Sequence, residues 1–465
     1  MFEPCGNVAL LGLGASTKEA AKYLAGPACP KVESVTLVAQ IADAQKPAAA
    51  ELQALGVKVA PQLEGSYDLG VVSPGIPCIG DFYRAGQQHC AQLIGEPELA
   101  WRVSPQAWVG ITGTNGKTTT TTLACELIAA AGIPARTVGN IGLPPIACVE
   151  GRKPGEVFVA ELSSFQLQSS YQLHPHVGVL LNVTPDHVEW HGSLEAYAQA
   201  KERLFQNMNA DDLAVLGDDE TCAGVEARLR ARGVRVAVLG AVPAADAPDG
   251  AWVDGQDRLV VRLKGCDQVL CHVDDMLIKG PHNVQNALAA AACALEMGAD
   301  AAAVEAALRT FKPLSHRIEP VGRVAGVGYY DDSKGTNTDA TVKAILAFPA
   351  GGTLVLLGGH DKGTDLTELA QTVAANCKAA VCYGEAGERI AAAVGQAVAA
   401  HPGCEVLRAL KMHEAFEAAR QRAVAGDVVL LSPACSSFDE FTGYVQRGNT
   451  FQSWVGELVA AEDGE

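Results

Sequence analysis

Short apolar runs alternate with stretches of helical periodicity over residues 1–100 of the chain. Apolar runs bounded by glycine and polar residues are typical of strands buried on both faces of a parallel sheet. The pattern predicts strands at Asn7–Leu11, Ser34–Val38 and Asp68–Val72. Apolar residues at helical spacing between them predict helices at Thr17–Leu24 and Ala48–Leu55. This alternation predicts a small, doubly wound, Rossmann-like unit.

Two further sets of strands follow, again alternating with helices. The second set is predicted at Trp108–Thr112, Val157–Glu161 and Val177–Asn182. Over residues 254–275 the pattern changes to two short alternating strands, which indicates a small antiparallel sheet, and an Ala-rich helical segment follows from Asn283. The third set begins near Pro313, with strands predicted at Gly328–Asp331, Thr353–Leu357, Ala380–Tyr383 and Val428–Leu431.

We therefore predict an α/β protein built of three consecutive α/β domains, at residues 1–100, 101–313 and 314–465. The first and third are expected to be Rossmann-like, and the central one to combine a parallel sheet with a small antiparallel sheet. The length of 465 residues agrees with this number of domains, because domains average roughly 150 residues.

The composition is that of an ordinary globular protein, with 48% hydrophobic and 19% charged residues. Its 35 basic and 53 acidic residues give a net charge of −18. An acidic chain makes a poor general nucleic-acid binder, so no nucleic-acid partner is expected. Such a surface also gives an anionic substrate no long-range attraction, so any phosphate site must be built locally.

No membrane insertion is expected, because no apolar run approaches the length that crosses a bilayer. The N-terminal MFEPCGNVALLGLG lacks the basic region of a secretory signal. The 14 cysteines are scattered without a C-x-x-C pair. We interpret them as reduced, mostly buried thiols of a cytoplasmic protein rather than as disulfides or metal ligands.

The strongest chemical signal is GTNGKTT at Gly113–Thr119, between a β-branched strand and the helical segment TTTLACELIAAAG. This strand–loop–helix context is what a P-loop requires. Backbone N–H groups hold phosphate oxygens, Lys117 reaches the terminal phosphates, and the Thr118 hydroxyl can bind Mg²⁺. The loop departs from the general P-loop pattern at Ile111, where that pattern has glycine.

Two more predicted strands end in residues suited to metal and phosphate chemistry. Glu161 ends the strand VFVAE, and Asp186 and His187 follow the strand of VGVLLNVTPDH. The carboxyl ends of parallel strands meet at one edge of a sheet, so Glu161 and His187 are expected to meet the P-loop there. His191 has no such support, and we interpret it as a surface histidine.

The segment Gly12–Thr17, GLGAST, resembles a dinucleotide fingerprint but has Thr17 in place of the third glycine. The second strand also ends without the acidic residue that binds ribose, so a nicotinamide site is poorly supported. A diphosphate cradle at a helix N-terminus is compatible with these residues. The turn Ser73–Pro77, SPGIP, is expected at the same sheet edge.

Three polar loops follow apolar strands in the third predicted domain. They are DDSKGTN at Asp331–Asn337, GGHDK at Gly358–Lys362, and SPACSSFD at Ser432–Asp439. Because strand carboxyl ends share one sheet edge, the three loops together predict a second binding pocket.

At GTNGKTT the chain resembles the Mur ligase family of amide-bond-forming enzymes, and ELSSFQL, NVTPDH, GPHNVQN, SHRIEP and DDSKGTN follow in the family's order. The resemblance covers essentially the whole chain. Within the family, SPGIP and LSPACSSFDEFTGYVQRG are similar to members that attach D-glutamate to UDP-N-acetylmuramoyl-L-alanine.

The resemblance implies a role for each matching residue. Lys117, Glu161, His187 and Lys201 match the catalytic residues. Matches to ATP contacts are Gly113, Thr114, Asn115, Gly116, Lys117, Thr118, Thr119, Asn283, Asn286, Arg317 and Asp332. Two Mg²⁺ ions are implied, held by Thr118, Glu161, His187 and a carbamylated Lys201. The UDP end of the substrate is implied at Gly14, Ala15, Ser16 and Gly75, and D-glutamate at Lys334, Thr336, Lys362, Ser437 and Tyr444. Asn140 is implied to contact either phosphate or the UDP-muramoyl substrate, and Ser163 matches the substrate-binding residues.

The implied reaction activates a carboxylate with ATP as an acyl phosphate, which the amine of D-glutamate then attacks. Either His187 or the carbamate of Lys201 could take the amine proton, and both stay open here. Two positions depart from the family pattern. Ala39–Ile41 lacks an Asp found there in some members, and Tyr444 stands where Phe is familiar. A monomer is expected, whose domains close around the substrates before the chemical step.

Three alternatives remain at this point. A sibling ligase that adds another amino acid, or a folylpolyglutamate synthetase, is disfavoured by the D-glutamate pocket motifs. A P-loop ATPase that forms no bond would not need the three polar loops of the third predicted domain. A nicotinamide enzyme rests on the incomplete glycine fingerprint alone.

Overall fold

The computed structural model describes residues 6–463 except 28, 30, 40–46, 187, 362 and 401. The chain divides into two compact units. The first unit comprises Met1–Met276 and Gln285–Thr310, and the second comprises Leu277–Val284 and Phe311–Glu465. Residues on both sides of the predicted boundary at residue 100 therefore lie in the first unit.

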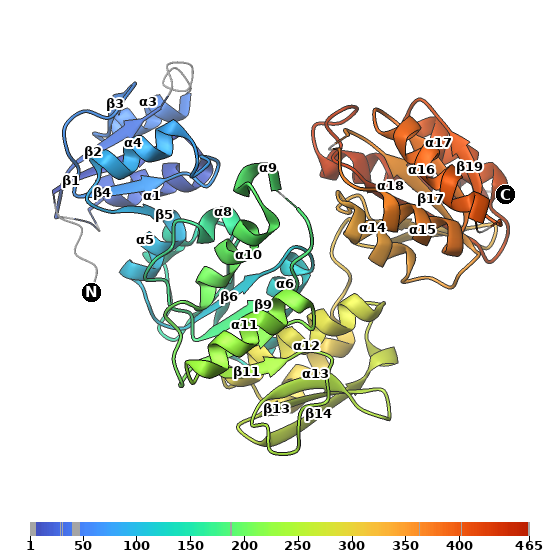
Figure 1. Ribbon diagram of the computed structural model, residues 1–465, viewed down its shortest axis with the longest axis horizontal. Helices are drawn as coiled ribbons and strands as arrows, with labels where there is room; N and C mark the ends of the chain where they lie inside the picture. The colour runs from blue at the N-terminus through green and yellow to red at the C-terminus, as the bar shows by residue number, and fades with distance from the viewer. Residues whose placement is uncertain are drawn as a thin grey trace. The chain divides into compact units, whose positions relative to one another are not determined.

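The N-terminal part of the first unit is a five-stranded parallel sheet in the order β3-β2-β1-β4-β5, with its helices around it (Figure 1). Its strands are β1 (Gly6–Leu11), β2 (Val32–Val38), β3 (Lys58–Ala60), β4 (Leu69–Val72) and β5 (Leu93–Gly95). Its helices are α1 (Ala15–Ala25), α3 (Pro47–Ala54), α4 (Asp81–His89) and α5 (Glu96–Val103). Strands and helices alternate here as predicted, and apolar strands such as LGVV of β4 are buried throughout.

The helix α5 joins this sheet to the next part of the unit through two fully buried carboxylates. Glu98 accepts hydrogen bonds from the amides of Gln172 (2.9 Å) and Leu173 (3.3 Å) and from the Arg102 guanidinium (2.6 Å). Glu96 accepts one from the Ile146 amide at 2.7 Å, while its other oxygen is buried without a partner among the described residues. The hydrophobic core is continuous across this junction.

Glu96 should make the stability of the protein depend on pH. Burial raises the pKa of Glu96 from 4.5 to about 8, against a smaller opposite effect of the Ile146 hydrogen bond. The folded state then holds this proton more tightly than the unfolded state does. The contribution of Glu96 to the stability of the folded protein is complete below the pKa that Glu96 has in the unfolded chain. This contribution is lost as the pH rises through the pKa that Glu96 has in the folded protein.

Glu96→Gln cannot ionise at this position. We therefore expect its free energy of unfolding, relative to that of the wild type, to rise by on the order of 1–3 kcal/mol when the pH is raised from about 5 to about 8. Urea unfolding of both proteins at the two pH values measures this change. The exposed Glu457 on helix α18 (Tyr444–Asp463) supplies the control Glu457→Gln, for which no such change is expected. An equal difference between Glu96→Gln and the wild type at both pH values would contradict the prediction.

A six-stranded parallel sheet follows, in the order β11-β10-β9-β6-β8-β7. Its strands are β6 (Trp108–Thr112), β7 (Ala135–Gly139), β8 (Val157–Glu161), β9 (Val177–Leu180), β10 (Leu213–Leu216) and β11 (Arg235–Val238). Its helices are α6 (Lys117–Ala130), α7 (Pro145–Val149), α8 (Ser164–Leu167), α9 (Val188–His191), α10 (Leu194–Glu202), the 3-10 turn η1 (Arg203–Phe205) and α11 (Glu220–Ala231). The strands β6 and β8 have the predicted bounds.

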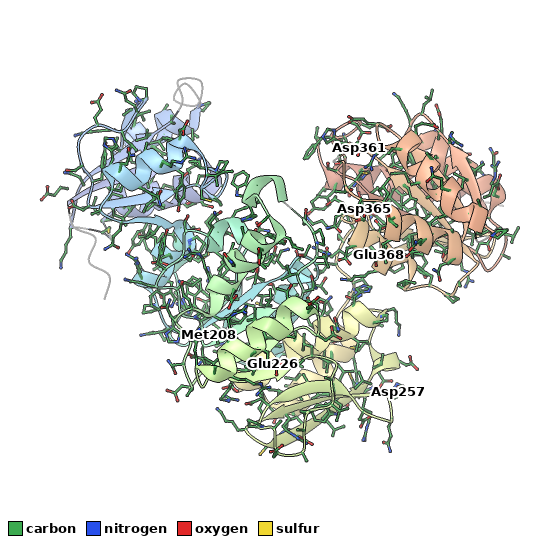
Figure 2. All side chains as sticks on the ribbon, in the orientation of Figure 1. Met208, Glu226, Asp257, Asp361, Asp365 and Glu368 are labelled. Atoms are coloured by element: carbon green, nitrogen blue, oxygen red, sulfur yellow. The ribbon has the colours of Figure 1, made fainter. Side chains whose placement is uncertain are left out.

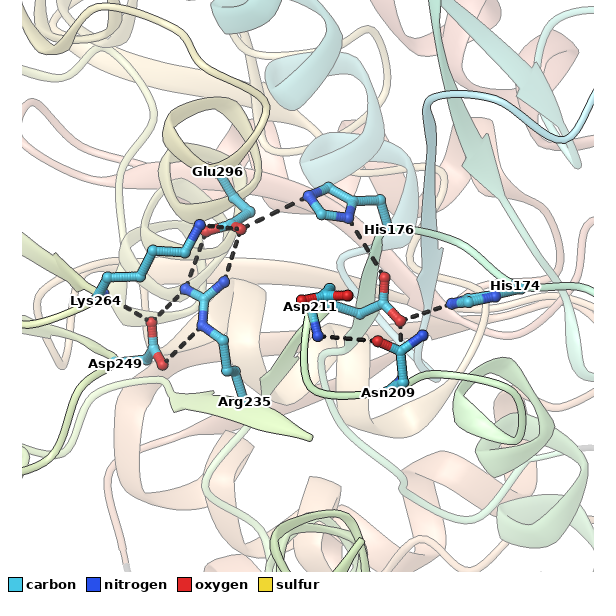
Figure 3. A network of polar contacts seen from close by, with 9 residues as sticks. His174, His176, Asn209, Asp211, Arg235, Asp249, Lys264 and Glu296 are labelled. Atoms are coloured by element: carbon cyan, nitrogen blue, oxygen red, sulfur yellow. Dashed lines mark hydrogen bonds and ion pairs between the residues drawn. The ribbon is translucent and has the colours of Figure 1, made fainter. Parts of the chain in front are cut away.

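The first unit ends in the predicted small antiparallel sheet, in the order β12-β13-β14. Its elements are β12 (Gly250–Val253), β13 (Arg258–Leu263), β14 (Cys266–His272) and the 3-10 turn η2 (Val273–Asp275), followed by α12 (Pro281–Glu296) and α13 (Ala301–Thr310). A polar network ties α12 to β11 (Figure 3). Arg235 bonds Asp249 at 2.6 Å and Glu296 at 2.7 Å. Although burial opposes its ionisation, hydrogen bonds from His176 and Arg235 lower the pKa of Glu296 to about 2.

The second unit is built on a six-stranded sheet in the order β15-β16-β20-β17-β18-β19, in which β15 alone is antiparallel to its neighbour. Its strands are β15 (Glu319–Val324), β16 (Val327–Asp331), β17 (Thr353–Gly358), β18 (Cys377–Tyr383), β19 (Glu405–Arg408) and β20 (Val428–Ala434). Its helices are α14 (Thr338–Ile345), α15 (Thr367–Asn376), α16 (Gly387–Ala400), α17 (Met412–Arg422) and α18 (Tyr444–Asp463).

Two predictions about composition can be compared with the structure. The described cysteines are free thiols and most are buried, although Cys266 is exposed. Among the helices within the described ranges, none combines the length and hydropathy that crossing a membrane requires.

Candidate active site

The predicted P-loop, Gly113–Thr119, follows β6 and runs into the first turn of α6, which is the strand–loop–helix context expected from the sequence. Gly116 precedes the first turn of α6 with a φ of +83°, a left-handed conformation that favours glycine. A Cβ at this position would also lie 2.4 Å from Oδ1 of Asn286 on α12. The Thr120 hydroxyl donates to the same Oδ1 at 3.2 Å, so Asn286 packs directly against the loop and α6.

Asn182, two residues after the end of strand β9, forms hydrogen bonds with this loop. Its Oδ1 accepts from the Asn115 amide at 2.9 Å, and its backbone carbonyl accepts from the Thr114 amide at 2.9 Å. No role is predicted for Asn182 from the sequence. Its place as a polar residue at the end of a predicted strand was the signal that could have identified it.

Lys117 begins α6 and folds back over the loop. Its Nζ donates to the carbonyl oxygens of Gly113 at 2.9 Å and Thr114 at 2.8 Å. Thr118 is half-buried beside it, and Thr119 is buried. The lysine is therefore held where the backbone of the P-loop turns.

Glu161 meets the P-loop because β8 pairs with β6, with Glu161 in register with Ile111. Glu161 is 1% exposed, and its Oε1 accepts from Asn140 Nδ2 at 2.7 Å. Its Oε2 is buried without a hydrogen-bond partner among the described residues. Leaving a carboxylate oxygen unbonded in the interior is costly, which marks this oxygen as a candidate metal ligand.

Lys201 reaches the same place from α10 and is only 1% exposed. Its Nζ donates to the carbonyl of Gly113 at 2.7 Å and lies 4.4 Å from the centre of the Tyr197 ring. Burial and then the positive charge of Lys117 lower the pKa of Lys201 well below its usual range, while Asp186 and Glu161 act in the opposite direction. The two lysines therefore converge on one carbonyl oxygen.

The prediction that His191 is a surface histidine is wrong. His191 is 7% exposed, and its ring stacks on Phe165 and lies against Tyr197. Its Nε2 is 3.0 Å from the Ser164 hydroxyl. The burial arises because α9 packs its last residue between α8 and α10, which the local sequence does not reveal.

Two other predicted residues of this region have different outcomes. His187 lies outside the described residues. Ser163 caps α8, because its Oγ accepts from the Gln166 amide at 3.3 Å.

The loops expected to hold the UDP end come together in the N-terminal sheet. A Cβ on Gly14 would lie 2.8 Å from Ser73 Oγ, and the Gly75 amide donates to that oxygen at 3.4 Å. Ala15 and Ser16 open helix α1. Thr17 donates to the Gly12 carbonyl at 2.6 Å and accepts from the Gly14 amide at 3.0 Å, so it closes the turn as a cap. Gln40 and Ile41 lie outside the described residues.

Four predicted nucleotide contacts lie at or beyond the start of α12. Asn286 belongs to the first unit, whereas Asn283, Arg317 and Asp332 belong to the second. Asn283 lies in the part of α12 that belongs to the second unit and donates to the Lys279 carbonyl at 2.8 Å. Asp332 accepts from Ser432 Oγ at 2.7 Å. Burial raises the pKa of Asp332 to about 7, although Ser432 and the nearby positive charge of Arg317 act in the opposite direction.

The three polar loops of the second unit lie together at the carboxyl ends of β16, β20 and β17. The Ala434 amide donates to the Gly335 carbonyl at 2.9 Å, and the His360 amide donates to the Ser436 carbonyl at 2.8 Å. Ser437 is 2% exposed, and Lys334 Nζ lies 4.0 Å from the centre of the Tyr444 ring.

Two residues of the predicted D-glutamate pocket remain. The Thr336 amide donates to the Lys334 carbonyl at 2.8 Å, within the loop that follows β16. Lys362 lies outside the described residues. Its neighbour Asp361, labelled in Figure 2, accepts from Arg389 Nε at 2.7 Å.

Another cluster of the second unit has the composition of a metal site. His316, Glu319 and Asp331 bring one ligand atom each within 4.8 Å of one another. These atoms already form hydrogen bonds, since His316 Nδ1 lies 2.6 Å from Asp331 Oδ2 and Gln452 donates to both carboxylates at 2.9 Å. The cluster is therefore a hydrogen-bonded network in its own right.

The chain is similar to known proteins over most of its length. The Mur ligase middle domain model matches residues 111–294, and the model described as Mur ligase, glutamate ligase domain matches residues 316–435. A UDP-N-acetylmuramoylalanine–D-glutamate ligase of Pelotomaculum thermopropionicum is 43% identical over 391 residues, which cover 84% of each chain. The enzyme of the same name from Solibacter usitatus is 40% identical over 399 residues, 86% of each chain.

Solved structures show the same fold. A pseudomurein peptide ligase type C from Methanothermus fervidus matches with a TM-score of 0.58 at 17% identity, covering 97% of this chain and 99% of that one. A UDP-N-acetylmuramate–alanine ligase from Thermotoga maritima matches with a TM-score of 0.55 at 18% identity, with the same coverage. The P-loop, the two family models and relatives at this identity lead to one conclusion: the chain belongs to the Mur ligase family.

Proposed function

We propose that this chain is an ATP-dependent amide ligase that joins D-glutamate to UDP-N-acetylmuramoyl-L-alanine in the synthesis of peptidoglycan precursors. The names of its curated relatives support this pair of substrates. The observation that carries the chemistry is the convergence of Lys117 and Lys201 on the Gly113 carbonyl, at 2.9 and 2.7 Å, beside Glu161.

The proposed reaction has two steps. An oxygen of the substrate carboxylate attacks the γ-phosphorus of ATP, so that ADP leaves and an acyl phosphate forms. The amine nitrogen of D-glutamate then attacks the acyl carbon, phosphate leaves, and the nitrogen loses a proton to a base. His187 and a carbamate on Lys201 remain the two candidates for that base.

Lys117 and the P-loop amides would hold the phosphates in line with the attacking carboxylate. Lys117 is suited to this because its ammonium already lies among the backbone carbonyls of the loop, at 2.8 and 2.9 Å. Asn182 bonds the loop and Asn286 packs against Gly116, so the donors are organised before the substrate arrives.

Magnesium fits the residues present, because Glu161 Oε2 is buried without a partner among the described residues. Carboxylate and hydroxyl oxygens are ligands that Mg²⁺ accepts. Thr118, Glu161, His187 and a carbamylated Lys201 would hold two ions. Bound magnesium would neutralise charge on the transferred phosphoryl group.

We further propose three domains, at residues 1–100, 101–313 and 314–465. The first would bind the UDP end through Gly14, Ala15, Ser16 and Gly75, while Asn140 and Ser163 of the second would contact the substrate. The second would bind ATP. The third would close over ATP with Arg317 and Asp332 and bind D-glutamate with Lys334, Thr336, Lys362, Ser437 and Tyr444. The working protein would be a cytoplasmic monomer.

Release of ADP with a panel of amino acids, each with and without UDP-N-acetylmuramoyl-L-alanine, tests this function. We expect turnover only when this acceptor and D-glutamate are both present. L-glutamate should be a poor substrate by at least about 100-fold in kcat/KM, because fixed partners for two carboxylates distinguish the stereocentre by their geometry.

Each alternative has its own result in this assay. Turnover with a different amino acid would indicate a sibling ligase, and equal use of D- and L-glutamate would have the same meaning. ADP release that does not depend on any amino acid would indicate an ATPase.

A further inference from the structure

Arg447 is a fully buried arginine in the first turns of α18, with 0% of its surface exposed. Its Nε donates to Ser333 Oγ at 3.0 Å, and its Nη2 donates to the Ser333 carbonyl at 2.8 Å. Both Nη atoms donate to the Cys435 carbonyl at 3.1 Å. The guanidinium thus bonds two separate loops at once.

These two loops carry most of the proposed D-glutamate pocket. Ser333 directly precedes Lys334 in the loop after β16, and Cys435 lies two residues before Ser437 in the loop after β20. The Ser333 hydroxyl donates in turn to the Tyr444 carbonyl at 2.8 Å. The backbone beside Lys334 and Ser437 is therefore connected through Arg447, and the backbone of Tyr444 joins them through the Ser333 hydroxyl.

The third loop also approaches Arg447. A Cβ on Gly359, in the loop after β17, would lie 3.2 Å from Arg447 Nη1 and 2.3 Å from the Ser436 carbonyl. Glycine at this position allows the β17 loop to lie against the guanidinium. Arg447 therefore occupies the point where the three loops meet.

The bonding of Arg447 does not fit a role in stability alone. Within the described part of the chain it forms no ion pair, and its hydrogen bonds go to neutral oxygens. Burying a charge without a counter-charge costs folding free energy, and an apolar side chain of similar size would pack α18 at lower cost. A planar fork of donors, in contrast, suits the simultaneous binding of two carbonyls and a hydroxyl.

We propose that Arg447 is a positioning residue that sets the spacing of the D-glutamate-binding loops. It fixes the positions of Lys334 and Ser437 by bonding the backbone beside them, and that of Tyr444 through the Ser333 hydroxyl, without touching the substrate itself. This inference rests on the proposed function, because it assumes that these loops bind the incoming amino acid.

The test compares KM values for the two substrates whose sites are proposed in different domains. Arg447→Lys keeps the charge but cannot bond both carbonyls and the hydroxyl in one plane. Misplacement of a binding group by about 1 Å costs on the order of 100-fold. We expect the KM for D-glutamate to rise at least about 10-fold. The KM for UDP-N-acetylmuramoyl-L-alanine should stay within about twofold of the wild-type value.

Phe451→Leu provides the matched control. Phe451 lies one turn further along α18, is 0% exposed and packs in the hydrophobic core. The control should lower the thermal midpoint and leave the KM for D-glutamate unchanged. If Phe451→Leu raises that KM as much as Arg447→Lys does, or if a folded Arg447→Lys leaves it unchanged, the positioning role is wrong.

A second variant covers the case in which Arg447→Lys does not fold. Ser333→Ala removes only the hydroxyl between Arg447 and Tyr444, and it should raise the KM for D-glutamate by about 3-fold or more. An unchanged KM in this variant would overturn the proposal. Wild-type turnover with another amino acid would refute the proposed function instead, and the same KM comparison would then be made with that amino acid.

Discussion

Ligation by a Lys117→Ala variant should fall by about 10²–10³-fold while the protein stays folded. Removing one preorganised electrostatic contact to a developing charge typically costs about 3–4 kcal/mol in the transition state. Lys117 is well placed to provide that contact, since its Nζ lies 2.9 Å from the Gly113 carbonyl in the P-loop. Its side chain is only half-buried and bonds backbone carbonyls of the loop rather than packing in the hydrophobic core, so folding should be little affected.

ADP release under saturating D-glutamate measures this loss, and circular dichroism with thermal unfolding confirms that the variant is folded. Lys411→Ala is the matched control, because Lys411 is an exposed lysine that precedes α17 in the second unit. The control should retain wild-type turnover. A Lys117→Ala variant with half the wild-type turnover would show that the P-loop assignment is wrong.

The Lys201→Ala variant should be nearly inactive, and a small carboxylic acid such as acetate should restore part of its activity. A cationic lysine beside bound magnesium would repel it and has no lone pair to offer. Carbamylation by CO₂ replaces the cation with a carboxylate-like group whose oxygens suit Mg²⁺. The reaction requires the neutral amine, and burial together with the charge of Lys117 lowers the pKa of Lys201 in that direction.

Lys117→Ala is the control for the acetate experiment. Acetate can replace the carboxylate-like group proposed at Lys201 but cannot replace a cation, so it should not rescue Lys117→Ala. Full activity of Lys201→Ala in CO₂-depleted buffer would exclude the carbamate. Equal rescue of both variants by acetate would show that the acid acts elsewhere.

Much of the fold follows from the order of residues along the chain. Continuous apolar strands such as Trp108–Thr112 and Val157–Glu161 were predicted with their observed bounds, because a strand buried on both faces needs apolar side chains throughout. Parallel strands end at a common edge, so the approach of Glu161 to the P-loop could also be predicted. The short antiparallel strands of β13 and β14 were visible in their alternating pattern.

Other features depend on which elements pack against each other, and no local pattern contains that information. Lys201 and His191 lie on helical segments with several polar residues, yet α8, α9 and α10 pack together and bury both side chains. Arg447 lies in helix α18, and its contacts arise only because the loops after β16 and β20, which are far apart in sequence, meet at its guanidinium. Periodicity specifies the face that a helix buries, whereas long-range packing selects what that face contacts. The burial of these charged and polar side chains is therefore a property of the assembled fold.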